Sequence, residues 1–249
     1  MAFPFVCKAY TPDQFPALQA YLDGLSFNLF RPKFIVVHNT APPTLADYAV
    51  WQKRGSPSDE QWGRNLEAFY KSKWSGGPHF VATPRGAVVL NPPNAPGVHT
   101  PSWNRVSWGV ETVGDFETDA FEGPIADNLI ALLAVLHHAA GINPTPFVLG
   151  RSGLHFHKED HATTHQTCPG RHMDKVNLTS RVIAAMGKLR GADPHAEPHP
   201  PAPVAPAAPQ KAAAPVAAPK AAIVSAPRAP PPKPAARAFD WFFDLFGTG

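Results

Sequence analysis

The stretch Lys33–His38 reads KFIVVH, and Asn39 and Thr40 follow it at once. Its middle residues are one phenylalanine followed by three β-branched residues. A short apolar run of this composition is typical of a strand buried inside a sheet. The stretch therefore predicts an interior β-strand that ends on a histidine, His38.

Outward from this strand, apolar periodicity and helix-capping residues predict a chain in which helices and strands are mixed. The predicted helices span residues 11–25, 45–52, 58–73, 124–140 and 178–189, and further strands or extended segments span residues 79–83, 87–90, 107–113, 147–149 and 154–157. Strands mixed with helices predict one α/β domain over residues 1–190, with a central mixed β-sheet flanked by helices.

Proline separates this domain from the rest of the chain. Of the 31 prolines, 14 lie between Pro194 and Pro234. A segment of alanine, proline and scattered basic residues cannot bury a core, so residues 191–238 are predicted to be a disordered, basic, Pro/Ala-rich linker. Residues 239–249 form a short aromatic tail, which either docks weakly on a membrane or envelope surface or folds back on the domain.

The composition also excludes several classes of protein. The net charge is +3 and the predicted domain has no basic stripe, so we expect no nucleic-acid partner. Two cysteines are too few for a disulfide-stapled domain. The N-terminus lacks a signal-peptide pattern, and no apolar stretch is expected to reach the ~18–20 residues of a membrane span. We therefore expect a protein that is made in the cytoplasm. We also expect it to be a monomer.

A second informative stretch, His157–Gly170, reads HKEDHATTHQTCPG. Its cysteine, Cys168, lies on a Pro-Gly bend that holds the side chain in place. Thiolates and neutral imidazoles are both good zinc ligands. Together with His38, this stretch predicts a three-ligand zinc site with an open fourth position.

Each of these residues has an alternative interpretation. His38 alone is more often a hydrogen-bonded core histidine, and Cys168 alone is often a small buried apolar residue. If residues 154–157 form a strand, His155 and His157 share one face. The residues leave the histidine partner of Cys168 open among four candidates: His155, His157, His161 and His165.

Four motifs, in this order, resemble those of the type 2 zinc-dependent N-acetylmuramoyl-L-alanine amidases. This superfamily includes the peptidoglycan recognition proteins and phage amidase lysins. The motifs are FIVVHNTA (Phe34–Ala41), PHFVATPRGAVV (Pro78–Val89), GVHTPSWNRVSWGVETVGD (Gly97–Asp115) and FHKEDHATTHQTCPG (Phe156–Gly170). The resemblance covers approximately residues 30–190, and the four motifs together are far more specific than any one of them.

The resemblance implies that Zn²⁺ is bound by His38, His157 and Cys168. It further implies that Glu111 is the general base, whereas an edge-strand glutamate facing solvent is the alternative. His165 is a candidate donor to the oxyanion. It would take the place of a lysine that many members carry two residues before the third ligand.

The chain departs from that family pattern at two positions. Gln166 stands where many members have the lysine, and Pro78 stands where some have a tyrosine. The resemblance also suggests that the loop before the Glu111 strand borders the substrate groove. The predicted substrate-binding residues are His79, His99 and Asn104, with loop hydrogen bonding as the alternative role.

The expected function is hydrolysis of bacterial peptidoglycan at the amide between N-acetylmuramic acid and L-alanine. Two alternatives are a peptidoglycan-binding module with impaired catalysis and an unrelated zinc hydrolase such as a protease. The absence of a His-Glu-x-x-His motif weakens the protease hypothesis. We expect first a phage or prophage lysin that is released through a holin and acts on the periplasmic or extracellular cell wall. The alternative roles are a recycling enzyme and an antibacterial effector against neighbouring cells.

Overall fold

The stretch KFIVVH forms strand β2 (Phe34–Val37), and every residue of this strand is buried. The structure is a computed structural model that describes residues 6–54 and 58–192. Strand β2 lies between β5 (Ser107–Thr112) and β6 (Leu154–Phe156) and pairs in parallel with both. The prediction of a buried interior strand is therefore confirmed.

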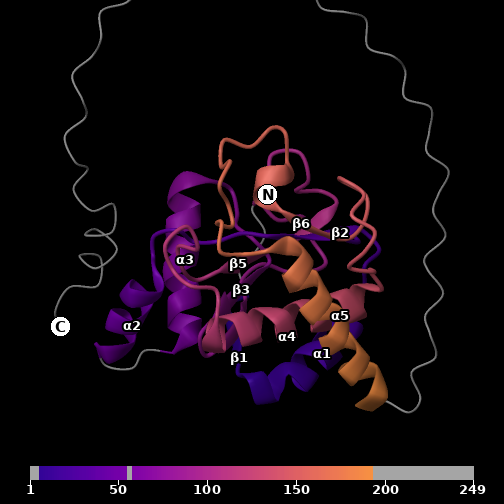
Figure 1. Ribbon diagram of the computed structural model, residues 1–249, viewed down its shortest axis with the longest axis horizontal. Helices are drawn as coiled ribbons and strands as arrows, with labels where there is room; N and C mark the ends of the chain where they lie inside the picture. The colour runs from indigo at the N-terminus through magenta and orange to yellow at the C-terminus, as the bar shows by residue number, and fades with distance from the viewer. Residues whose placement is uncertain (1–5, 55–57, 193–249) are drawn as a thin grey trace, which may run out of the picture. The chain divides into compact units, whose positions relative to one another are not determined.

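Three further strands extend the sheet beyond β5. They are β1 (Lys8–Tyr10), β3 (Phe80–Thr83) and β4 (Gly86–Val89), and the order across the sheet is β1-β4-β3-β5-β2-β6. Strand β3 is parallel to β5, while β4 is antiparallel to both of its neighbours. The result is the predicted α/β fold, a mixed sheet flanked by helices (Figure 1).

One face of the sheet carries the main hydrophobic core. Ile35 and Val37 of β2 point to this face with Trp108 and Val110 of β5, because alternate strand residues share a face. Three helices cover it: α1 (Phe15–Asp23), α4 (Gly123–Ala140) and α5 (Lys175–Ala192).

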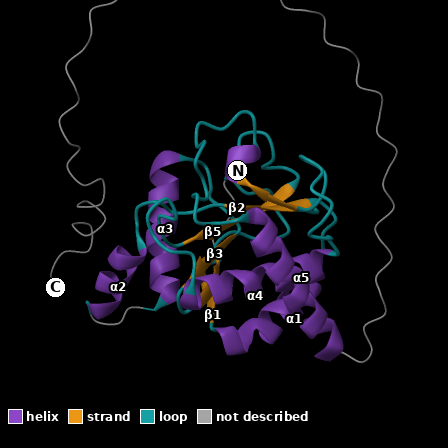
Figure 2. Cartoon of the chain, in the orientation of Figure 1, coloured by secondary structure: helices purple, strands orange, loops and turns teal. Residues whose placement is uncertain are grey.

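The opposite face carries a smaller apolar cluster, in which Phe34 and Val36 pack with Trp103. Helix α3 (Asp59–Lys73) packs on this side against β1 and β4, and α2 (Leu45–Lys53) contacts α3 through aromatic side chains. Figure 2 shows the long loops, in teal, on the side of the sheet away from α1, α4 and α5. These loops border the face that carries the site described below.

Helix α4 is long and apolar enough to cross a membrane by length and composition alone, with a mean hydropathy of 1.2 over 18 residues. The expectation that no apolar stretch reaches this length is therefore wrong. Within the fold, however, 61% of this helix is buried, and it packs against α1, α5 and the sheet. It is therefore a core helix of the domain, over the residues 124–140 that were predicted to be helical.

A few element bounds differ from the prediction. Residues 147–149 form no strand; Val148 makes only an isolated bridge to Ser152. Helix α5 begins at Lys175 instead of residue 178, because the Asp174 carboxylate accepts the main-chain N–H of Asn177 at the helix start. The short strand β1 was not predicted, since three residues carry too little pattern. The predicted linker and tail lie outside the described residues, except residues 191–192, which belong to α5.

Candidate metal centre and active site

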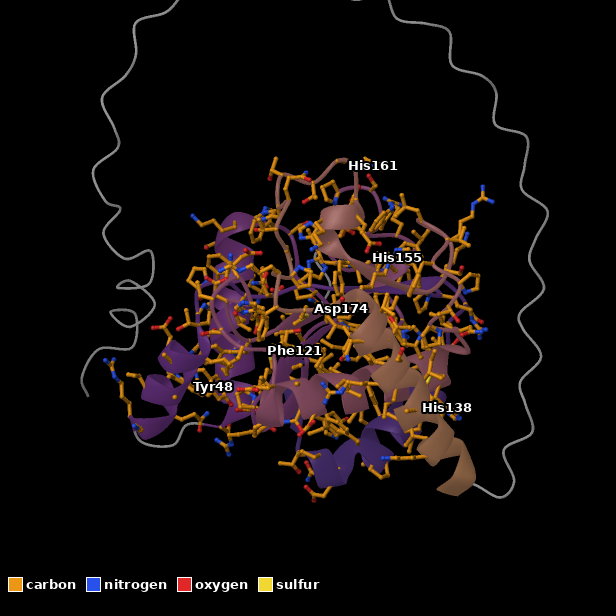
Figure 3. All side chains as sticks on the ribbon, in the orientation of Figure 1. Tyr48, Phe121, His138, His155, His161 and Asp174 are labelled. Carbon is orange, nitrogen blue, oxygen red and sulfur yellow. The ribbon has the colours of Figure 1, made fainter. Side chains whose placement is uncertain are left out.

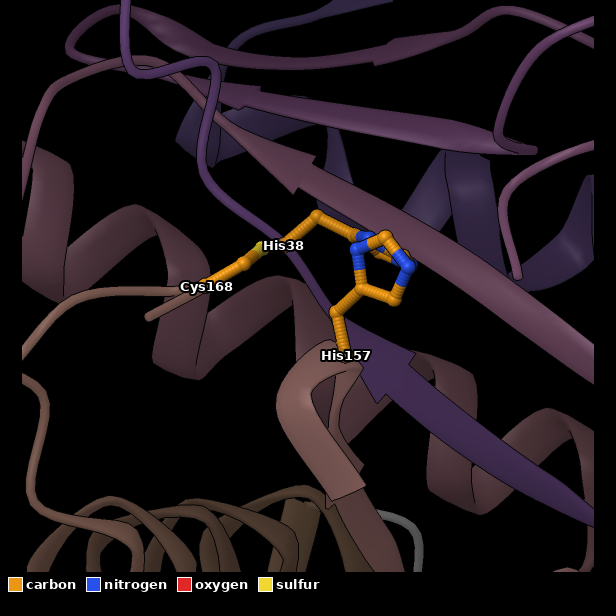
Figure 4. A group of neighbouring side chains, drawn as sticks. All are labelled: His38, His157 and Cys168. Carbon is orange, nitrogen blue, oxygen red and sulfur yellow. The ribbon is translucent and has the colours of Figure 1, made fainter. Parts of the chain in front are cut away.

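Three side chains meet where the parallel strands end. His38 follows β2, His157 follows β6, and Cys168 lies on the loop before α5. Because Val37 pairs with both Val110 and Phe156, the next residue on each strand reaches the same edge of the sheet. The ligand atoms of His38, His157 and Cys168 lie within 4.8 Å of one another, and Figure 4 shows the three side chains converging. The carboxyl ends of parallel strands are a common place for a site.

Hydrogen bonds orient the His38 ring toward this cluster. Its Nε2 lies 3.1 Å from Nδ1 of His99, whose own Nε2 lies 3.4 Å from the main-chain oxygen of Ser107. A carbonyl can only accept, so His99 donates from Nε2 and accepts at Nδ1. His38 therefore donates from Nε2, which leaves its Nδ1 lone pair for a metal. Burial, with the neighbouring His157, His99 and His165, lowers the pKa of His38 well below its ordinary value.

The His157 ring is held in the same manner from another loop. Its Nε2 lies 2.8 Å from Oγ1 of Thr163, which also accepts the main-chain N–H of His165. This contact leaves Nδ1 of His157 for the cluster. Burial, followed by the neighbouring His165, lowers the pKa of His157 to about 4. Both imidazoles are therefore neutral at pH 7, the form that binds a metal.

The donor set fits a tetrahedral cation. Zinc bound by imidazole and thiolate would hold its ligand atoms about 3.4–3.6 Å apart. The observed limit of 4.8 Å is within reach of small side-chain rotations. Burial and the nearby Glu111 carboxylate raise the pKa of the Cys168 thiol, so the thiol keeps its proton until a cation takes its place.

Glu111 lies on the interior strand β5, and its side chain is only 8% exposed. The alternative of an edge-strand glutamate facing solvent is therefore excluded. The phenol of Tyr70, on α3, donates a hydrogen bond of 3.1 Å to Oε2 of Glu111. Burial raises the pKa of Glu111 to about 7, even though the Tyr70 hydrogen bond lowers it. A carboxyl group with this pKa can take up and release a proton near neutral pH.

The two other histidines of the stretch His157–Gly170, His161 and His165, are exposed, and neither is one of the three cluster residues. The exposed His165 stacks its ring on His157, with the ring centroids 5.2 Å apart. His161 is exposed at the outer end of its loop (Figure 3). Gln166 is exposed and donates to the main-chain oxygen of Thr163.

His155 lies on β6 and packs against Phe34 and Trp103, whereas β6 ends before His157, which begins a 3-10 turn. The buried His155 ring instead contacts the Glu159 carboxylate through Nδ1 and the main-chain oxygen of Ser152 through Nε2. His155 is therefore a hydrogen-bonded core residue, and of these two histidines only His157 belongs to the cluster.

The three predicted substrate-binding residues belong to one hydrogen-bonded network around the loop before β5. Oδ1 of Asn104 accepts the main-chain N–H groups of His99 and Thr100, which folds the loop over the sheet. His79 is fully buried, and its ring bonds to the main chain of Gly109 and Ala95. Contact of these residues with a substrate stays a prediction. Every polar contact that the structure gives His79 is to main chain.

Several residues of the site were not singled out from the sequence. Tyr70 supports Glu111, Thr163 orients His157, and the buried Asp160 ties two loops by accepting the main-chain N–H groups of Ser102 and Ala162. Helical spacing could have indicated that Tyr70 is buried, since it follows Trp62 and Leu66 at four-residue intervals. No pattern in the sequence indicates its partner on β5.

A comparison of the sequence with protein families identifies the family of the chain. The profile described as N-acetylmuramoyl-L-alanine amidase matches residues 28–171, more than half of the chain. The chain therefore belongs to the N-acetylmuramoyl-L-alanine amidase family, and this membership supports peptidoglycan hydrolase activity. The matched region contains the cluster residues His38, His157 and Cys168 as well as Glu111. Among curated proteins, none matches the chain.

Solved structures with similarity include amidases and a recognition protein. The amidase LysC from Clostridium intestinale is 25% identical, with a TM-score of 0.46 over 64% of this chain and 89% of that chain. The Ph2119 endolysin from a Thermus scotoductus bacteriophage is 23% identical, with a TM-score of 0.42 over 61% and 85%. Drosophila PGRP-LB, in complex with tracheal cytotoxin, is 19% identical, with a TM-score of 0.46 over 61% and 82%.

Proposed function

We propose that this protein is a zinc-dependent amidase that cleaves the amide between N-acetylmuramic acid and L-alanine in bacterial peptidoglycan. The observation that carries the proposal is a complete His38–His157–Cys168 ligand set beside a buried carboxyl group, Glu111, whose pKa is about 7. The family of the chain supports the substrate class. Zinc in this cluster would supply an activated water and polarise the scissile carbonyl.

In this proposal Glu111 does the proton transfer. It accepts a proton from the attacking water and delivers that proton to the leaving amine of L-alanine. Such general acid–base catalysis contributes about 10²–10⁴-fold to the rate. Since burial raises the pKa of Glu111 to about 7, the carboxylate form is lost on acidification, and activity should fall as the pH drops below neutrality.

His165 is proposed to donate a hydrogen bond to the oxyanion that develops on the carbonyl. Its exposed ring stacks on the metal-cluster residue His157, so a substrate can reach it. Gln166 is exposed at the position where many members have a lysine. Replacing His165 with alanine should therefore lower turnover, whereas Gln166→Ala should change it little. Equal turnover in His165→Ala and wild type would remove His165 from the mechanism.

The central experiment is a digest of purified sacculi by wild type, Cys168→Ala and Glu111→Gln, followed by mass spectrometry of the soluble products. Wild type should release peptides with a free L-alanine amino terminus, and both variants should lose this activity. Zinc content measured alongside should fall only in Cys168→Ala. Binding to sacculi without release would favour a binding module, and cleavage within the stem peptide would favour a different hydrolase.

The cellular role proposed is that of a phage or prophage lysin, made in the cytoplasm as a monomer and released to the cell wall. Residues 1–190 form the catalytic domain in this proposal, and the C-terminal arm adds weak envelope contact. Expression of the full chain in a bacterial host, with and without a co-expressed holin, tests the route. Lysis that needs the holin supports it, and equally rapid lysis without the holin contradicts it.

A further inference from the structure

The buried pair Tyr70–Glu111 connects two elements that are distant in the chain. Tyr70 lies on α3 and Glu111 on β5, and each residue is 8% exposed. The phenol donates to Oε2 of Glu111 at 3.1 Å. Within the described residues this is the one side-chain hydrogen bond that the Glu111 carboxyl group receives. The other carboxyl oxygen, Oε1, is left for a further partner.

A second buried phenol–carboxylate pair shows what a structural pair looks like in this fold. Tyr48 donates to Oδ1 of Asp59 at 2.6 Å, and Thr83 donates to Oδ2 at 2.5 Å. Both oxygens of Asp59 therefore have donors from the domain itself. The Glu111 carboxyl group has a donor on one oxygen only, and it lies close enough to Cys168 to raise the pKa of that thiol.

The Tyr70 ring is held firmly by its own surroundings. A Cβ added at Gly77 would stand 2.7 Å from Cδ2 of Tyr70, so the main chain passes directly over the ring. Trp74 packs on the same ring with centroids 5.8 Å apart, and Phe69 lies beside it at 5.5 Å. A phenol fixed in this manner can fix the rotamer of the carboxylate that it contacts.

Resting on the proposed function, we propose that Tyr70 is a positioning residue that holds Glu111 by Oε2 so that Oε1 faces the reacting water. The phenol stays a donor at all working pH values, because burial, followed by the nearby Glu111, raises the pKa of Tyr70 well above 10. The titratable side chains coupled to Glu111 are Tyr70 of α3, which donates to it, and Cys168 of the loop before α5, whose pKa Glu111 raises. Through its hydrogen bond Tyr70 also favours the ionised form of Glu111.

The test compares Tyr70→Phe with Tyr48→Phe, which removes the matched hydroxyl at the structural pair (Tyr48 is labelled in Figure 3). The substrate is a soluble muramyl peptide, and the pH profile of kcat/KM is measured on zinc-loaded protein. Tyr70→Phe should lower kcat about 10- to 100-fold, the worth of a hydrogen bond to a charged group, with little change in KM. In the pH profile of Tyr70→Phe, the acid limb, which is the fall of kcat/KM toward low pH, should move to higher pH. Tyr48→Phe should leave the acid limb in place.

Two further measurements separate positioning from general damage. In a Glu111→Gln background, Tyr70→Phe should cause no additional loss, because the group through which it acts is gone. Zinc content should equal that of wild type. If Tyr70→Phe does not fold, site-specific fluorotyrosine at position 70 keeps the ring and strengthens the donor, so the acid limb should move to lower pH.

An unchanged acid limb in Tyr70→Phe, or an equal loss in the Glu111→Gln background, would overturn the positioning role. The proposed function fails by a different result, namely a Glu111→Gln enzyme that is as active as wild type. The two failures are therefore distinguishable in one set of measurements.

Discussion

Gly109 on β5 is the position where a single methyl group disturbs the support of the metal centre. An added Cβ would stand 2.4 Å from Cγ, 2.6 Å from Nδ1 and 2.7 Å from Cδ2 of the His99 ring. Non-bonded carbon atoms in contact lie about 3.5–4.0 Å apart, so in Gly109→Ala the ring must move away by about 1 Å. The main-chain contacts of the loop through Asn104 oppose a larger displacement.

The movement of the His99 ring affects His38, because the two rings share a hydrogen bond. The distance from Nε2 of His38 to Nδ1 of His99 is 3.1 Å, and an added displacement of about 1 Å breaks the bond. Loss of such a partner typically lowers metal affinity about 10- to 100-fold, or about 1.4–2.7 kcal/mol. Overpacking should also lower the free energy of unfolding of the metal-free protein by about 1–3 kcal/mol.

The assay is a competition for zinc against a chelator of known affinity, with urea unfolding of the metal-free protein measured in parallel. Gly187→Ala on α5 is the matched control, because nothing lies within 4 Å of a Cβ at that position. It should leave zinc affinity unchanged and stabilise the helix by up to about 1 kcal/mol.

The coupling between the two residues provides the sharper check. His99→Ala removes the ring that collides, so adding Gly109→Ala to it should cause no further loss of zinc affinity. Wild-type zinc affinity in Gly109→Ala would falsify the argument that His99 positions His38. Losses that simply add in the double variant would contradict it as well.

Three further predictions concern pH and loop structure. Because burial raises the pKa of the Cys168 thiol, zinc must displace a proton, and zinc affinity should rise from pH 6 to pH 8; a flat profile would contradict this. Burial of Glu159 opposes its ionisation, but hydrogen bonds from His155 and Lys175 outweigh the burial and lower the pKa of Glu159. The contribution of Glu159 to stability is therefore present above the ordinary carboxyl pKa and is lost on acidification. The difference in urea stability between wild type and Glu159→Gln should therefore shrink from pH 6 to pH 3. Asp160→Ala leaves the main-chain N–H of Ser102 without its acceptor and should lower the free energy of unfolding by about 1–3 kcal/mol, measured by urea titration.

Much of the secondary structure could be predicted from local sequence patterns, because the apolar run of β2 and the helix caps each depend on only a few neighbouring residues. Thr44 and Ser58 cap α2 and α3, and both helices begin within one residue of their predicted starts. The start of α5 was misplaced because the cap at Asp174 precedes the first apolar residue of the helix. The extended segment 154–157 was predicted one residue too long, because a strand end cannot be located within a residue from composition.

The sequence by itself determined the interior strand, the mixed α/β architecture and the identity of the three candidate ligands, since each depends on short motifs or on the resemblance that those motifs carry. Only the tertiary structure decided which ring nitrogens face the cluster and that Glu111 is buried. It also brought Tyr70 to Glu111 across 41 residues of chain. The physical reason is that strand order and helix packing set these contacts. They join residues far apart in the chain, and no local pattern encodes such a distance.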